Sequence, residues 1–167
     1  YDERGATLYQ GNAPQEYWQI IHRTSGSINS SARDMAKFVH FMLLRGSTAA
    51  GPIVSPESVD RMETPTTLPG NAAGIRAGYA LASYTSGHKA LGVAFHGHNG
   101  GVNGGVSELV YSNELGQGYA FMINNGNGAA MGQISQAIKD YLLRDAKTPE
   151  IESPALPAQY KEIDGYY

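Results

Sequence analysis

The sequence predicts an α+β fold in which helices cover an antiparallel sheet. Apolar residues recur at helical spacing in an early and a late segment, and four strand-like runs lie between them. The runs are joined by short connections, which favour antiparallel neighbours because a parallel pair needs a long crossover. At 167 residues the chain fits one domain with a substantial core.

The clearest helix signal begins at Ser31, a residue type that caps helices, with Asp34 three positions later in the place of a capping box. Gly46 marks the end of this helix. The apolar positions follow helical spacing: Met35, Phe38, Val39, Met42 and Leu43. This pattern predicts an amphipathic helix with one buried face.

Two further helices are predicted, and a loop over residues 66–76 follows the first of them. The first is short, because Pro56 follows Ser55 at its first position and Pro65 lies beyond its end. The second runs over about residues 129–145, and one face carries Met131, Ile134, Ile138, Tyr141 and Leu142. Both would pack on the sheet.

The strands are expected over four runs bounded by turn signals, among them Ser86-Gly87 and residues 113–116. Residues 1–24 show no periodicity and are expected to be extended or loop. The tail from residue 147 on is Pro-rich and has the composition of a linker. The four predicted strands are 78–85, 91–97, 107–112 and 118–124.

Composition excludes several classes of function. A net charge of −3 and a pI near 5.9 argue against nucleic-acid binding. No apolar run approaches the roughly 20 residues of a membrane-spanning helix, so no membrane segment is predicted. The absence of cysteine rules out disulfides, thiolate metal sites and a cysteine nucleophile. The chain begins at Tyr1 without methionine, so either a leader was removed or the sequence is part of a longer protein.

Residues 96–105, His-Gly-His-Asn-Gly-Gly-Val-Asn-Gly-Gly, are the segment most suited to chemistry. Histidine titrates near neutrality, and glycines let a substrate approach the backbone. His96 and His98 are two residues apart and would face the same way on a strand. We do not interpret this pair as a metal site, because zinc needs three or four ligands and no other histidine supplies an obvious third. No metal and no cofactor is predicted.

Two motifs resemble the serine β-lactamase-related hydrolases, which include class C β-lactamases, D-Ala-D-Ala carboxypeptidases, D-aminopeptidases and esterases. Residues 26–38, Gly-Ser-Ile-Asn-Ser-Ser-Ala-Arg-Asp-Met-Ala-Lys-Phe, are similar to the family's glycine-to-helix signature. Residues 97–101 with the glycine pair 104–105 resemble its third motif. The resemblance covers about residues 26–145 and implies the C-terminal portion of the β-lactamase/transpeptidase-like fold.

The resemblance also implies roles for residues of the third motif. His98 takes the basic position, Asn99 that of threonine and Gly100 that of glycine, and the backbone N–H of Gly101 would help to form an oxyanion hole. His98 would contact the proton network of the nucleophile or a substrate carboxylate. Asn99, Gly100 and His96 are expected to bind substrate or support the site. Histidine in place of lysine is closer to the esterase and peptidase branches.

The family's nucleophile is not predicted within this chain. No serine of the chain fits a Ser-x-x-Lys motif that opens a helix, and Tyr111-Ser112-Asn113 follows the third motif, so its Tyr-x-Asn letters are interpreted as a coincidence in a turn. We therefore expect residues 1–146 to be part of a serine hydrolase domain that lacks its N-terminal portion. Residues 147–167 would be a linker and the start of a further domain.

Such a chain is expected to be inactive alone and not to be labelled by a serine-directed acylating probe. Its partners would be a small-molecule or peptide substrate and the remaining part of the hydrolase domain. An incomplete sheet edge also allows a homo-oligomer. A periplasmic or extracellular location follows from the resemblance alone. The alternative is a non-catalytic ligand-binding or interaction module with the same fold.

Overall fold

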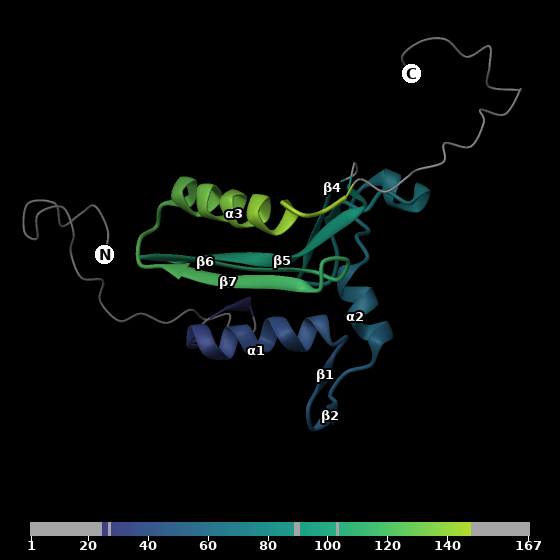
Figure 1. Cartoon of the computed structure of the whole chain (residues 1–167), viewed down its shortest axis with the longest axis horizontal. Coiled ribbons are helices and arrows are strands. Elements are labelled where there is room, and N and C mark those ends of the chain that lie inside the picture. The colour runs from purple at the N-terminus through teal and green to yellow at the C-terminus, as the bar shows by residue number, and fades with distance from the viewer. Residues whose placement is uncertain (1–24, 27, 89–90, 103, 148–167) are drawn as a thin grey trace, which may run out of the picture.

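The structure is a computed structural model and describes residues 25, 26, 28–88, 91–102 and 104–147. The predicted α+β class is confirmed: a five-stranded antiparallel sheet has helices on both faces (Figure 1). Each strand lies beside the next one in sequence, in the order β3-β4-β5-β6-β7. The strands are β3 (Gly78–Tyr79), β4 (Tyr84–His88), β5 (Val93–Val102), β6 (Gly105–Ser112) and β7 (Gln117–Ile123).

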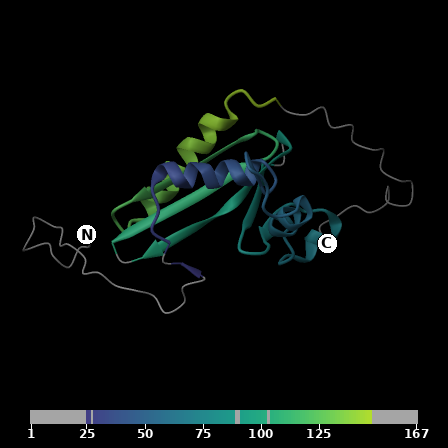
Figure 2. The same cartoon turned by 90° about the horizontal axis from the view of Figure 1, so that it is seen from below.

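The described part of the chain has three α-helices around this sheet: α1 (Ala32–Leu43), α2 (Pro56–Glu63) and α3 (Gly128–Leu143). α1 and α3 lie on opposite faces of the sheet, and α2 lies toward one end (Figure 1). Figure 2, which looks onto the side of α1, shows this helix crossing the strands at an angle. No helix among the described residues is long and apolar enough to cross a membrane.

The helix α1 begins where the sequence predicts it. The side chain of Ser31 accepts a hydrogen bond from the backbone N–H of Asp34 at 3.1 Å, which satisfies one of the free donors of the first turn. Val39 and Met42 are buried and pack with Tyr111 of β6. Gly46 follows the helix with a φ of +83°, a conformation that glycine adopts without strain.

On the opposite face, α3 covers a second apolar cluster formed by Val93, Phe95 and Val110, with Leu142 packed against it. The expectation that Tyr141 belongs to the buried face is wrong, because its side chain is 62% exposed. The guanidinium of Arg144 lies 3.8 Å from the centre of the Tyr141 ring. The Tyr141 ring thus packs against Arg144 on the solvent side, while Leu142 and Leu143 pack against the core.

The segment between α2 and the sheet is more ordered than the predicted loop over residues 66–76. It contains a 3₁₀-helix, η3 (Pro69–Ala73). The side chain of Asn71 holds the turn together, since it accepts from the N–H of Leu68 at 2.8 Å and donates to the carbonyls of Ile75 and Ala77. A small hairpin of β1 (Ser47–Thr48) and β2 (Gly51–Pro52), which was not predicted, precedes α2.

The first predicted strand, 78–85, is in fact two strands joined by a tight turn. The N–H of Ala80 donates to the carbonyl of Ser83 at 2.8 Å, and Ala82 has a φ of +54°. A left-handed alanine carries no turn signal in its residue type, which explains the missed turn. Ser86-Gly87, predicted as a turn, lies within β4 instead.

Candidate functional site

The strand β5 extends beyond its neighbour β4 and leaves a one-sided edge. β4 pairs with β5 only as far as Tyr84↔Gly97, whereas β6 continues to pair as far as Val102↔Gly105. Residues 98–102, which we call the β5 overhang, therefore have β6 as their only strand neighbour among the described strands. All of them are exposed. The overhang contains the glycines and the histidine of the predicted site.

His98 is held by hydrogen bonds at both ring nitrogens. Its Nδ1 bonds the carbonyl oxygen of Asn99, and its Nε2 lies 2.7 Å from the hydroxyl of Tyr79 on β3. A carbonyl oxygen only accepts, so Nδ1 carries the proton. In the neutral imidazole Nε2 is then an acceptor, and the Tyr79 hydroxyl donates to it.

Two residues of the β5 overhang, Asn99 and Gly101, direct their backbone polar groups to the side away from β6. The imidazole of His98 bonds both the Asn99 carbonyl and the hydroxyl of Tyr79 on β3. The Asn99 carbonyl therefore faces the β3 side. Backbone groups in an antiparallel strand alternate between its two sides. The N–H of Gly101 therefore points to the same open side. The Asn99 side chain itself lies on the opposite face of the sheet from that of His98.

Two glycines of this segment differ in what their surroundings demand. A Cβ at Gly97 would collide with the backbone carbonyl oxygen of Leu109, so the packing of β5 on β6 requires glycine there. A Cβ at Gly101 would meet Val106 at 3.8 Å, an ordinary contact. Neither crowding nor a positive φ explains glycine at position 101.

His96 lies on β5 just before the overhang, and it is buried, with 2% of its surface exposed. The hydroxyl of Thr85 lies 2.7 Å from the carbonyl of Glu63 and 2.9 Å from Nδ1 of His96. Because the carbonyl takes the only hydroxyl proton, Nδ1 must be the donor to Thr85. Nε2 is then an acceptor, and it has no hydrogen-bond partner among the described residues.

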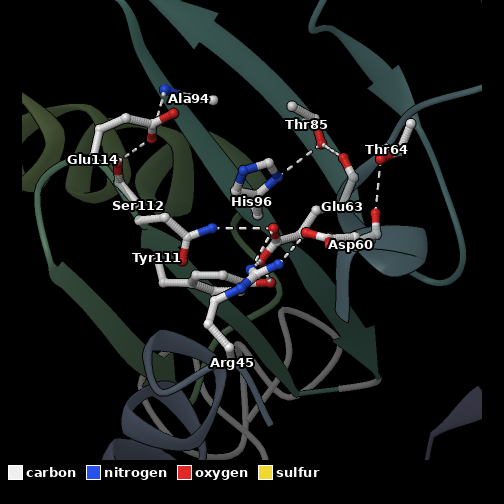
Figure 3. A network of polar contacts seen from close by, with 12 residues as sticks. Arg45, Asp60, Glu63, Thr64, Thr85, Ala94, His96, Tyr111, Ser112 and Glu114 are labelled. Carbon is white, nitrogen blue, oxygen red and sulfur yellow. Dashed lines mark hydrogen bonds and ion pairs between the residues drawn. The ribbon is translucent and has the colours of Figure 1, made fainter. Parts of the chain in front are cut away.

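The carboxylate of Glu63, at the end of α2, is the centre of the polar network beside His96 (Figure 3). It accepts from Arg45 at 2.7 Å, from the Tyr111 hydroxyl at 2.9 Å and from the Asn113 amide at 3.0 Å. Arg45 also pairs with Asp60. Tyr111 and Asn113 thus both donate hydrogen bonds to this carboxylate. The two residues of the Tyr-x-Asn sequence therefore have a structural role in this chain.

Sequence reasoning did not find this network, because its members come from separate elements. Glu63 is 18 residues from Arg45 and 50 from Asn113. A pocket of about 250 Å³ lies next to it. The pocket is lined by the end of α2, the segment around η3 and the centre of β5: Asp60, Glu63, Thr64, Pro65, Asn71, Gly74, Ile75, Arg76 and His96.

A second buried carboxylate, Glu108, lies on the α3 face of the sheet. It accepts from the hydroxyls of Tyr84 at 2.8 Å and Tyr119 at 2.9 Å, and Tyr119 also meets Ser135 of α3 at 2.9 Å. Burial first, and then the neighbouring carboxylate, raises the pKa of Tyr84. This network joins β4, β6, β7 and α3 and has no bond to the β5 overhang.

Comparison with known families identifies the chain. A family model described as Beta-lactamase matches residues 2–142, most of the sequence. The chain belongs to the β-lactamase family. The resemblance seen in its two motifs is thereby confirmed. Comparison with curated proteins gives no match, and comparison with solved structures gives none either.

Within this β-lactamase-family chain the Ser-x-x-Lys spacing does occur once, from Ser86 to Lys89. Ser86 lies in the strand β4 rather than at the start of a helix, and Lys89 lies outside the described residues. Among the described residues no group of three His, Cys, Asp or Glu side chains is placed to hold a metal ion. Residues 1–24 and the tail after 147 lie outside the described part.

Acid should destabilise this β-lactamase-family chain through His96. Burial lowers its pKa, opposed by Glu63 and Glu114 and assisted by Arg76 and Arg45. The unfolded chain therefore takes up a proton below about pH 6.5, while the folded chain does not until a lower pH. The stability contributed by neutral His96 is complete above pH 6.5 and is lost as the pH falls.

Urea titrations of the wild type and the variant His96→Gln at a series of pH values from 7.5 to 5 test this expectation. The wild type should lose up to about 1.4 kcal/mol per pH unit more than the variant in the interval where only the unfolded chain is protonated. Equal pH dependence in the two proteins would show that His96 titrates alike in the folded and unfolded states.

Proposed function

We propose that this chain forms one wall of an acyl-transfer hydrolase site, whose serine nucleophile lies on residues outside it. Membership of the β-lactamase family supports hydrolase-related chemistry. The observation that carries the proposal is the β5 overhang, which presents His98 and the N–H of Gly101 on one open side. An acyl group bound there would meet the Gly101 N–H as a hydrogen-bond donor, with His98 close by.

In this proposal an activated serine attacks the carbonyl of an ester or amide, and water then hydrolyses the acyl-enzyme. The N–H of Gly101 stabilises the oxyanion that develops in each step. Loss of one such donor typically costs about 2.7–4 kcal/mol of transition-state stabilisation. The absence of a side chain at Gly101 lets the substrate reach this N–H, which accounts for a glycine that packing does not require.

The other predicted site residues have supporting roles in the proposal. Asn99 and Gly100 are part of the overhang, and the Asn99 carbonyl fixes the ring of His98. His96 lies one alternation further along β5 and supports the overhang from the core. In the proposal, residues 1–146 are then part of the hydrolase domain, and residues 147–167 are a linker and the start of a further domain.

The missing portion of the domain would bind at the free edge of the sheet. β7 pairs only with β6 among the described strands, so the outer backbone groups of residues 117–123 are available for another strand. We propose that the remaining part of the hydrolase domain pairs there. In its absence a second copy of the chain would take this edge and form a homo-oligomer.

The chain alone should therefore not be acylated on serine. Incubation with a fluorescent penicillin, followed by intact-mass measurement and peptide mapping, should show no serine adduct. A stoichiometric adduct on any serine of the chain would contradict the proposal, because it would show that the nucleophile is already present.

A non-catalytic binding module is the second candidate, favoured by the absence of a helix that opens with Ser-x-x-Lys in the described residues. In that case the overhang would hold a ligand without turning it over. The two candidates differ in what the residues preceding Tyr1 in the intact protein contain: a hydrolase requires a nucleophile motif there, and a binding module does not.

A further inference from the structure

The hydroxyl of Tyr79 stands between His98 and any molecule that would use its Nε2. Nδ1 of His98 bonds the Asn99 carbonyl and Nε2 meets the Tyr79 hydroxyl at 2.7 Å, so neither ring nitrogen is free. The Tyr79 side chain is 40% exposed, and its oxygen keeps lone pairs beyond the bond to His98. A reacting group therefore reaches His98 through Tyr79.

We propose that Tyr79 is a catalytic residue of this site and that His98 is its base. The proposal rests on the acyl-transfer function proposed above and names the atom of this wall that touches the reacting group, the Tyr79 hydroxyl oxygen. It assigns His98 an indirect role, since its Nε2 accepts the proton that Tyr79 gives up.

Tyr79 is fixed by its backbone on both sides. Its carbonyl accepts from the N–H of Thr66 at 3.0 Å, and its N–H donates to the Thr67 hydroxyl at 2.8 Å. It also pairs with Tyr84 across the β3–β4 ladder. The rings of Tyr79 and His98 meet edge to face with centroids 5.7 Å apart. These contacts hold the hydroxyl and the imidazole in register.

The arrangement has the three parts of an activated hydroxyl. Tyr79 supplies the hydroxyl, His98 the base within hydrogen-bond distance, and the Asn99 carbonyl the group that orients the base. This nucleophile–base–orienter geometry is the structural signature of hydroxyl groups that exchange protons during catalysis. The hydroxyls of Tyr84 and Tyr119 instead donate to the Glu108 carboxylate.

The proton transfers balance as follows. When the attacking hydroxyl, from serine or from water, forms its bond to the acyl carbon, its proton passes to the Tyr79 oxygen. The proton of Tyr79 passes at the same time to Nε2 of His98, which becomes an imidazolium. When the tetrahedral intermediate collapses, the bond to the leaving group breaks, and the reverse transfer delivers one proton to that group.

The activation of Tyr79 can be tested in this chain without a nucleophilic serine. Benzenesulfonyl fluoride reacts with a phenol oxygen: the O–S bond forms, the S–F bond breaks, fluoride leaves and the phenol proton goes to the base. Tyr141 is the internal control. It is more exposed, at 62%, but its ring contacts the guanidinium of Arg144, which has no lone pair to accept a proton.

Peptide mapping over time should show that Tyr79 is sulfonylated faster than Tyr141, and His98→Gln should slow Tyr79 by about 100-fold, the low end of what a positioned base contributes. His88→Gln is the matched control, since it removes another exposed histidine of the sheet. It should leave the rate at Tyr79 unchanged. An unchanged Tyr141 rate in each variant shows that the fold is kept.

Sulfonylation of Tyr79 no faster than Tyr141, or an equal rate in the His98→Gln variant, would overturn the proposal. Failure of the serine hydrolase function would look different: the intact protein would lack a nucleophile motif, while Tyr79 would still react in a manner that depends on His98. The two results are therefore separable.

Discussion

Replacement of Glu63 by glutamine is expected to lower the free energy of unfolding by about 3 kcal/mol, since removal of one partner from a buried ion pair typically costs about 3–5 kcal/mol. Glu63 is 8% exposed, and its carboxylate accepts from Arg45, Tyr111 and Asn113. A glutamine amide has one oxygen and two N–H donors, so some of these donors would face another donor. The lower end applies because Arg45 keeps Asp60 as a partner.

Asp60→Asn provides a matched control, because Asp60 pairs with the same arginine but its side chain is 64% exposed. An exposed ion pair contributes at most about 1 kcal/mol. Urea denaturation should therefore separate the two variants by at least about 2 kcal/mol. Similar losses in both would mean that burial of the Glu63 carboxylate does not decide its contribution.

The second large effect is expected at Gly97. Gly97→Ala should destabilise the chain by about 3 kcal/mol, the upper end for an added methyl group in a tightly packed site. The new Cβ would strike the carbonyl oxygen of Leu109, a backbone atom in the middle of the β5–β6 ladder. Such an atom moves only if neighbouring ladder hydrogen bonds are disturbed.

Gly101→Ala tests the same change on the same strand without the collision. Its Cβ would lie 3.8 Å from Val106, so stability should change by no more than about 1 kcal/mol, and a gain is expected because alanine restricts the unfolded chain. Thermal unfolding of the two variants checks the contrast. A large loss at Gly101 together with tolerance at Gly97 would reverse the assignment of structural and functional glycines.

The elements that the sequence predicts correctly have local causes. Ser31 caps α1 and Pro56 opens α2, and both features are set by side chains within a few residues. The turn at Ala82 was missed because its positive φ has no signature in the residue type. The pairing of β3 with β4 closes this turn, and the residue types on either side of it do not display that pairing.

In the candidate site, too, the sequence indicates some residues, while the fold determines their partners. The resemblance to a known family singles out His98 and Gly101, but the partners of these residues depend on the fold. Tyr79 is 19 residues from His98, and the side-by-side pairing of β3, β4 and β5 in one sheet brings the two together. Gly97 and Gly101 are alike as residue types, and the neighbouring strand β6 makes one of them indispensable to packing.

The proposal that a serine nucleophile outside this chain completes the site is tested most directly by the coding sequence that precedes the codon for Tyr1. A helix-opening Ser-x-x-Lys motif followed by Tyr-x-Asn, both in frame and before Tyr1, is the predicted result. An in-frame upstream region without a Ser-x-x-Lys motif would contradict the hydrolase and leave the binding module as the function of this fold.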